Sequence, residues 1–228
     1  GSNGNIVYQY WKPRRKTYAV YLWRNGVDIE SITELENEGA VPQEPYLFTA
    51  GRIDKLKRQD KIIEMLYLLH KKQINIHLYL AGHVEDKMYI EKVKNLVKTY
   101  GLEPYVHFMG AIPRRYMKKM AYYSKATVLW SDIANNGNVF YEVFSTGALI
   151  VAINDGSLDP FVTRDKNIFF ADSIEEAVED IQKLLNISQT ERCKMQNSAI
   201  SQSIKAIPSW EKRIYKEIKL LERYGNHL

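Results

Sequence analysis

Short apolar runs rich in β-branched and aromatic residues alternate with amphipathic stretches along most of this chain. Six of the runs have the length and composition of strands, and the stretches between and after them have a helical period. The predicted strands are 46–51, 74–82, 105–110, 126–131, 148–153 and 167–171, and the helices are about 59–72, 85–100, 113–123, 139–146 and 173–186. Because strands and helices alternate, we predict an α/β fold with a parallel sheet covered by helices on both faces.

Helix caps extend the prediction toward the end of the chain. Ser173 is followed three residues later by Glu176, and Ser188 by Glu191, which are the spacings of capping boxes. The second box opens a helix to about residue 205, and a last helix over 208–224 begins with Pro208.

The first 45 residues have a different pattern. Residues 17–23 have the composition of a strand, whereas 34–45 are acidic and contain glycine and two prolines, as linkers do. We therefore expect a linker and remnant over 1–44, a sheet domain over 45–206 and a separate final helix within 207–228. The opening Gly-Ser resembles an expression scar, so we expect a piece of a longer protein.

Composition is that of a soluble globular protein. The 228 residues are 45% hydrophobic and 26% charged, and the net charge of +5 suits an anionic ligand without by itself indicating nucleic acid. The single cysteine, Cys193, excludes an intrachain disulfide. With no apolar run near the roughly 20 residues of a membrane span and no secretory signal pattern, a cytoplasmic location is the default expectation.

Polar loops follow the predicted strands at the edge where open α/β sheets bind ligands. The loop after the first strand carries Arg52, Lys57 and Arg58, and the loop "NNGN" after the fourth leads into a helix. Fixed cations beside the free N–H groups of a helix N-terminus predict a phosphate site.

Asn138 and Glu142 are four residues apart and share one face of the predicted helix, with Asn138 also suited to the N-cap. Two interpretations of Glu142 stay open at this stage. Its carboxylate accepts hydrogen bonds from a ligand diol such as ribose, or it only pairs with Arg52 or Lys57. His83 follows a strand at the ligand edge, and the pattern favours a surface histidine over a ligand contact. His107 lies in an apolar strand, as a core histidine would.

Other site classes find little support. No sequence spacing typical of a metal site is present, and the P-loop and G-x-G-x-x-G patterns are absent. Dehydrogenase and P-loop NTPase functions are therefore disfavoured. Nucleic-acid binding would rest only on the net charge and scattered tyrosines, so it ranks well below the alternatives given next.

Five segments together resemble, in order and spacing, the carboxyl-terminal half of GT-B-fold glycosyltransferases of the family 4 type, which is a Rossmann-like domain. The resemblance covers about residues 20–224. The segments are "NGVD" (25–28), "AGRIDKLKRQDKIIEML" (50–66), "LYLAG" (78–82), "VHFMGAIP" (106–113) and "SDIANNGNVFYEVFSTGALIVAINDGS" (131–157).

The resemblance implies a retaining transfer of sugar from a nucleotide-sugar donor, commonly without an essential metal or other cofactor. It assigns catalysis to Arg52 and Lys57, which would bind the diphosphate and stabilise the leaving group. The remaining positions are expected to contact the donor: Gly51, His83, Val106, His107, Phe108, Asp132, Asn135, Asn138, Val139 and Glu142. In detail, Glu142 would hold the ribose, the backbone of 106–109 would face the base, and the amides of Asn138 and Val139 would face phosphate.

One departure from the family pattern concerns the sugar. A glutamate often stands eight residues before the position of Glu142, and this chain has Ala134 there. Asp132, Asn135 or Asn138 are the alternatives for contacting the sugar, and a nucleotide-binding module without catalysis is the alternative function. The resemblance also implies an amino-terminal domain outside this chain that binds a sugar, lipid or protein acceptor. Polysaccharide or glycan synthesis and peripheral membrane association of the full-length enzyme are further expectations.

Overall fold

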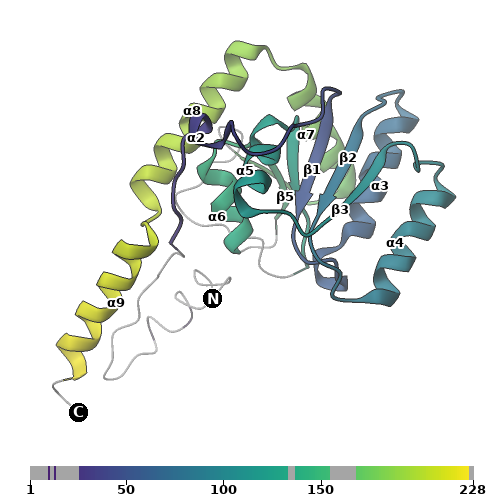
Figure 1. The fold of residues 1–228 in the computed structure, drawn as a ribbon. Helices are drawn as coiled ribbons and strands as arrows, with labels where there is room; N and C mark the ends of the chain where they lie inside the picture. Colours follow the sequence, from purple (N-terminus) through teal and green to yellow (C-terminus); the bar gives the residue numbers. More distant parts are fainter. Residues whose placement is uncertain (1–9, 11–12, 14–25, 133–136, 155–167, 226–228) are drawn as a thin grey trace.

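A computed structural model describes residues 10, 13, 26–132, 137–154 and 168–225 of the chain. Its centre is one parallel sheet of six strands in the order β3-β2-β1-β4-β5-β6 (Figure 1). The strands are β1 (Tyr46–Ala50), β2 (His77–Ala81), β3 (Val106–Gly110), β4 (Ala126–Leu129), β5 (Ile150–Ile153) and β6 (Ile168–Ala171). All six predicted strands are present, and the predicted parallel α/β fold is confirmed.

Helices follow the strands at the positions that the hydrophobic period predicts. They are η2 (Lys55–Lys57), α3 (Gln59–Lys71), α4 (Lys87–Thr99), α5 (Arg114–Tyr123), α6 (Asn138–Ser145), α7 (Ile174–Asn186), α8 (Gln189–Ala206) and α9 (Trp210–Gly225). The short η2 was not predicted. β2 begins three residues later than expected, because Ile74 still donates to the carbonyl of Leu69 at the end of α3 and the pairing with β1 starts at His77.

The sheet separates two hydrophobic cores. Neighbouring residues of a strand point to opposite faces, so Leu47 packs with α3, α4 and α7, whereas Phe48 packs with α5, α6 and α8. Both side chains are fully buried. Burial on both faces explains why the strands are nearly continuous apolar runs rather than alternating ones.

The two predicted capping boxes differ in the structure. At α8, Ser188 and Glu191 form the complete box, with each side chain accepting a hydrogen bond from the other's backbone N–H. At α7, Ser173 accepts from the backbone of Glu176 at 3.1 Å, but the Glu176 carboxylate accepts from Asp172, one residue before the cap. Both arrangements satisfy N–H groups that the first helical turn leaves without partners.

The acidic segment before β1, residues 31–45, forms a strap that packs along α5. It contains the short helix α2 (Ile32–Leu35), opened by a capping box between Ser31 and Glu34 that the sequence analysis missed. Lys119 of α5 donates to three backbone carbonyls of the strap, at Glu36, Glu38 and Gly39, over 2.6–3.0 Å. The proposed domain boundary near Pro45 therefore lies within a segment that packs on the sheet domain.

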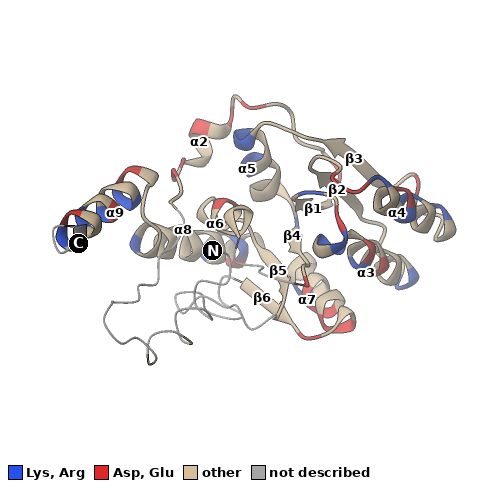
Figure 2. Ribbon diagram, turned by 90° about the horizontal axis from the view of Figure 1, so that it is seen from below, with Lys and Arg blue, Asp and Glu red and all other residues tan. Residues whose placement is uncertain are grey.

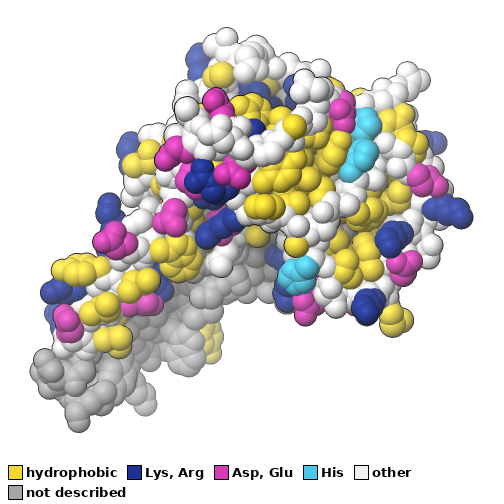
Figure 3. Space-filling view, viewed as in Figure 1, with side chains coloured by type: hydrophobic (Ala, Val, Ile, Leu, Met, Phe, Trp, Pro, Cys, Tyr) yellow, Lys and Arg dark blue, Asp and Glu magenta, His cyan; other side chains and the backbone are white. Residues whose placement is uncertain are grey.

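α9 extends beyond the sheet and its covering helices (Figure 1). Apolar and charged side chains alternate along its surface (Figure 3), with Ile214, Tyr215, Ile218 and Leu221 each about half exposed or more. Whether α9 contacts a further domain stays a prediction. Within the described residues, no helix combines the length and apolar character that crossing a membrane requires.

Candidate functional site

A candidate site lies where the sheet order changes direction. β1 pairs with β2 on one side and with β4 on the other. The chain leaves β1 toward β2 and leaves β4 toward β5, which lies in the opposite direction, so a crevice opens between the carboxyl ends of β1 and β4. A pocket of about 360 Å³ occupies this crevice. Its lining comes from the ends of β1 and β4, the loop after β1 and the start of α6: Thr49, Ala50, Gly51, Arg52, Lys57, Gln59, Leu129, Trp130, Ser131, Gly137, Asn138, Val139 and Phe140.

Local hydrogen bonds fix the loop that brings cations to this pocket. Asp54 caps η2 by accepting from the backbone N–H groups of Leu56 and Lys57, both at 3.0 Å. The carbonyl of Leu56 in turn accepts from the Ser131 hydroxyl and from the backbone of Asp132, both at 3.0 Å. The loop after β4 is thus tied to η2, and Lys57 is held at the pocket wall.

Arg52, Lys57 and the start of α6 surround the pocket, as the sequence analysis predicted. Arg52 is about half exposed and lies 3.4 Å from Asp54, so its guanidinium remains accessible to a ligand. Basic residues mark this loop and the start of α5 (Figure 2). The N-cap of α6 is Gly137, not Asn138 as predicted. Asn138 and Val139 are therefore first-turn residues, and the N–H groups of a first helical turn are suited to binding an anion.

Gln59 supplies a polar group that the sequence analysis missed. Its side-chain N–H donates to the carbonyl of Arg52 at 2.8 Å, while its side-chain oxygen is buried and has no hydrogen-bond partner among the described residues. Gln59 is 4% exposed and lines the pocket. A buried acceptor without a partner is costly, so this oxygen is a suitable partner for a ligand hydroxyl or N–H.

A second pocket of about 270 Å³ continues from the first and shares Gly51, Arg52 and Val139 with it. Glu142 lines this pocket, and its carboxylate accepts from the guanidinium of Arg114 at 2.5 Å. Of the two interpretations left open for Glu142, an ion pair is present, but its partner is Arg114 and not Arg52 or Lys57. Arg114 could have been found, because it opens the helix that follows β3 and therefore stands at the same sheet edge.

Close backbone packing shapes the floor of the second pocket. Gly51 and Gly82 directly follow β1 and β2, and a Cβ atom on Gly82 would lie only 1.8 Å from the carbonyl oxygen of Gly51. The φ of Gly82 is 150°, which other residues rarely adopt. His83 follows Gly82, lines the pocket and pairs with Glu85 at 3.0 Å on the surface, as the surface interpretation anticipated.

The segment expected to face the base, residues 106–109, lies within β3. Val106, His107 and Phe108 belong to β3 and line neither pocket, whereas Ala111 and Ile112, which follow the strand, line the second. Whether the backbone of residues 106–109 faces a nucleotide base stays a prediction. His107 is also no core histidine: it is half-buried, and burial together with the neighbouring His77 lowers its pKa.

Arg58 and Asp132 form a separate polar site. The guanidinium of Arg58 contacts Asp132 at 2.9 Å and Asp60 at 3.2 Å. These residues line a third pocket of about 260 Å³ together with Lys55, Tyr89 and Lys92. Asp132 thus points away from the crevice in which a donor contact was expected. Asn135 and Ala134 lie outside the described residues.

Comparison with known proteins now places the chain. The model of the family "Glycosyl transferases group 1" matches residues 31–206, and the chain belongs to this family. Such a match covers the strap, the sheet and the helices through α8, and so includes both pockets of the crevice.

Individual relatives agree with this placement. The chain is 26% identical over 212 residues to a human GDP-Man:Man(3)GlcNAc(2)-PP-Dol alpha-1,2-mannosyltransferase, covering 86% of this chain and 42% of the relative. It is 24% identical over 155 residues to an uncharacterised glycosyltransferase of Bacillus subtilis, YqgM, covering 66% and 42%. The chain thus spans less than half the length of the curated relatives it matches.

Solved structures share the fold at low sequence identity. Sucrose-phosphate synthase from Thermosynechococcus elongatus gives a TM-score of 0.79 at 19% identity, covering 96% of this chain and 57% of that one. A Staphylococcus aureus TarM variant in complex with Fondaparinux, alpha-GlcNAc-glycerol and UDP gives 0.75 at 19% identity, covering 94% and 42%. The predicted Rossmann-like, GT-B type of domain is confirmed.

Proposed function

We propose that this chain is the donor-binding part of a retaining glycosyltransferase, and that its crevice binds the nucleoside diphosphate of a nucleotide-sugar. The observation that supports this most is the meeting of Arg52, Lys57 and the start of α6 around one pocket at the switch point of the sheet. This arrangement suits a diphosphate, because cations and helical N–H groups both stabilise phosphate oxygens.

The reaction would break the bond between the anomeric carbon and a diphosphate oxygen, and form a bond from that carbon to an acceptor hydroxyl, which loses its proton. Negative charge then builds on the departing diphosphate. Arg52 and Lys57 would stabilise this charge, and preorganised groups of this kind are a large source of rate enhancement. We propose that this step does not require a metal ion.

Glu142 would hold the ribose diol in the second pocket. Glu142 is 9% exposed, and the guanidinium of Arg114 donates to one of its two carboxylate oxygens, which orients the carboxylate. The buried oxygen of Gln59 would bind a further polar group of the donor. The names of the relatives differ in the nucleotide, since one contains GDP-Man and the TarM structure contains UDP. We therefore propose only a nucleoside diphosphate.

Lys57 and Lys55 form a matched pair for testing this proposal. Both lie on η2, but Lys57 lines the crevice, whereas Lys55 is 75% exposed beside Asp86 and lines the third pocket. In calorimetry with UDP and with GDP, Lys57→Ala should weaken binding by about 1–3 kcal/mol, the usual effect of losing a charge-assisted hydrogen bond. Lys55→Ala should leave the affinity unchanged. Equal affinities for both variants, or no binding of either nucleotide, would overturn the proposal.

Transfer itself depends on an acceptor site, which we propose lies in a further domain. The chain incubated with labelled nucleotide-sugars and acceptors should bind donor and show at most slow hydrolysis, because excluding water and orienting the acceptor account for much of the barrier lowering. Efficient transfer by this chain would contradict that part of the proposal. Donor binding without transfer in the full-length protein would instead support a non-catalytic module.

A further inference from the structure

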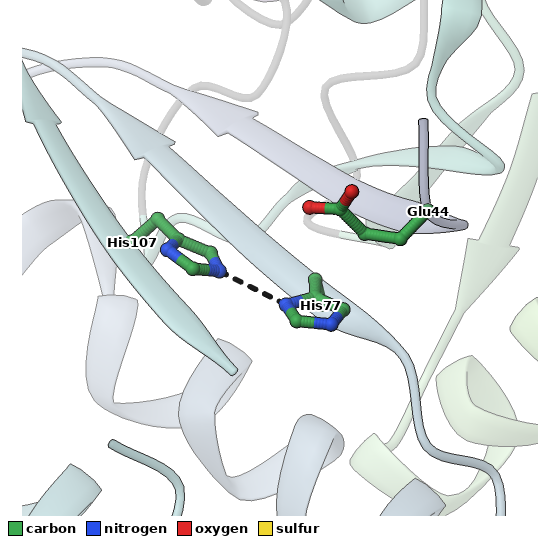
Figure 4. A group of neighbouring side chains, drawn as sticks. All are labelled: Glu44, His77 and His107. Atoms are coloured by element: carbon green, nitrogen blue, oxygen red, sulfur yellow. Dashed lines mark hydrogen bonds between the residues drawn. The ribbon is translucent and has the colours of Figure 1, made fainter. Parts of the chain in front are cut away.

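Three potential metal ligands meet at the amino ends of the strands, opposite the crevice. They are Glu44, two residues before β1, His77, the first residue of β2, and His107, the second residue of β3 (Figure 4). One ligand atom from each lies within 4.8 Å of the others. The sequence shows no metal spacing because these residues are about 30 positions apart, and only the pairing of parallel strands brings them together.

The two imidazoles are already close to the spacing that a metal ion needs. The Nδ1 atom of His77 and the Nε2 atom of His107 lie 2.9 Å apart and share a hydrogen bond. Zinc binds imidazole nitrogen at about 2.0–2.1 Å, so tetrahedral geometry places two such nitrogens about 3.3 Å apart. The rings need to separate by only a few tenths of an ångström, and the donating ring adopts its other tautomer so that both nitrogens offer a lone pair.

Neighbouring aromatic groups hold the ligands in place. Tyr79 stacks on His107 with ring centroids 4.3 Å apart, and its hydroxyl donates to Oε1 of Glu44 at 2.5 Å. Tyr105 packs beside His77, with centroids 5.2 Å apart. Hydrogen bonds from surrounding residues to metal ligands are a regular feature of metal sites, because they orient the ligands and tune their affinity. Glu44 is exposed, so its carboxylate can approach an ion without disturbing the core.

We propose that Glu44, His77 and His107 bind one divalent transition-metal ion of the zinc type, with water completing the coordination. Two imidazoles and one carboxylate are a ligand set that zinc accepts with an open position, and magnesium or calcium would need more oxygen ligands. The site is separate from the donor crevice: from His107 to Ala111, where the second pocket begins, the strand rises about 13 Å. A bound ion would join the end of the strap to two strands of the sheet.

Zinc titration of the chain, with calorimetry and a competing chelating dye, tests this site. His77→Ala and His107→Ala should each weaken zinc binding at least tenfold, and Glu44→Gln should weaken it severalfold. His83→Ala is the matched control, because His83 also pairs with a glutamate but has no second histidine beside it. Its zinc affinity should equal that of the wild type. Circular dichroism should show that each variant is folded.

A stability readout separates a built site from surface binding. At a zinc concentration of a hundred times the wild-type dissociation constant, the wild-type melting temperature should rise by about 5–10 °C, and that of each histidine variant by at most about half as much. UDP affinity should be the same with and without zinc, so failure here is distinguishable from failure of the proposed donor site. Zinc binding that is equally strong in wild type, His77→Ala and His107→Ala would overturn the proposal.

Discussion

Replacing Gly82 with alanine should damage the structure at the junction of β1, β2 and the crevice. The new Cβ atom would lie 1.8 Å from the carbonyl oxygen of Gly51 and 2.7 Å from its carbonyl carbon. Neither neighbour is a flexible side chain, so the backbone after β1 must move by more than about 1 Å to reach ordinary contact distances. This movement would carry Arg52 with it.

The size of the effect follows from two contributions. A φ of 150° is a strained conformation for alanine and costs about 1–3 kcal/mol. Moving the loop also weakens the backbone hydrogen bonds from Gly51 to Ala81 and from Ile53 to His83, each now 2.9 Å long. At about 1 kcal/mol per bond, the free energy of unfolding should fall by about 3–5 kcal/mol in all.

Gly101 provides the control for backbone strain alone. Its φ is 65°, yet a Cβ atom there would meet nothing within 4 Å. Gly101→Ala should therefore lower the free energy of unfolding by only about 1–2 kcal/mol, the cost of a left-handed conformation. The comparison isolates the clash between the ends of β1 and β2.

Urea unfolding followed by circular dichroism measures both variants against the wild type. Gly82→Ala should unfold at a clearly lower urea concentration than Gly101→Ala, and at low urea it alone should lose UDP affinity. Equal unfolding midpoints for the two variants would show that the close approach of Gly51 and Gly82 does not hold in solution, and the reasoning would then fail.

Three further measurements test other parts of the structure. Arg114→Ala should lower the free energy of unfolding by only about 1 kcal/mol, because Arg114 is half exposed. In a Glu142→Gln background the same change should have little effect on the free energy of unfolding, and additive effects of the two changes would contradict their pairing. For Asp60, burial raises the carboxyl pKa, but hydrogen bonds from Tyr89, Arg58 and Lys92 outweigh it, and the net pKa is lowered. Because the folded-state pKa is lowered, ionised Asp60 stabilises the fold above the unfolded value of 3.8, and this stabilisation is lost as the pH falls through the folded pKa. In urea unfolding, Asp60→Asn should therefore lower the free energy of unfolding at pH 7 and lower it less as the pH falls below 3.8. UDP affinity should fall as NaCl rises and be indifferent to EDTA, and a strict magnesium requirement would count against the proposed donor site.

The sequence predicted the fold well because hydrophobic runs and helical periods are local signals. It also brought Arg52, Lys57 and the start of α6 to one edge, since parallel strands end on the same side. Side-chain direction was less predictable. Asp132 follows β4 as expected, but Arg58 draws it into another pocket.

Partners from distant segments were also missed. Arg114 pairs with Glu142 across 28 positions, and no periodicity relates the two. The strap was taken for a linker because its glycine and prolines suggest one, while Lys119 of α5, which donates to its carbonyls, carries no local signal. Contacts of this kind depend on the register of the sheet and the packing of its helices, which single-sequence patterns do not contain.

The segment that enters the sheet domain and the segment that leaves it lie side by side. Val27 donates its backbone N–H to the carbonyl of Pro208 at 3.0 Å, and Gly26 lies so close to Trp210 that a Cβ atom would be 2.6 Å from its Cα. A module whose two ends are separated by one hydrogen bond can be inserted into a surface loop of another protein without forcing that loop open. Residues 26–210 thus begin and end side by side, and we expect a host protein carrying them in a surface loop to keep its own fold.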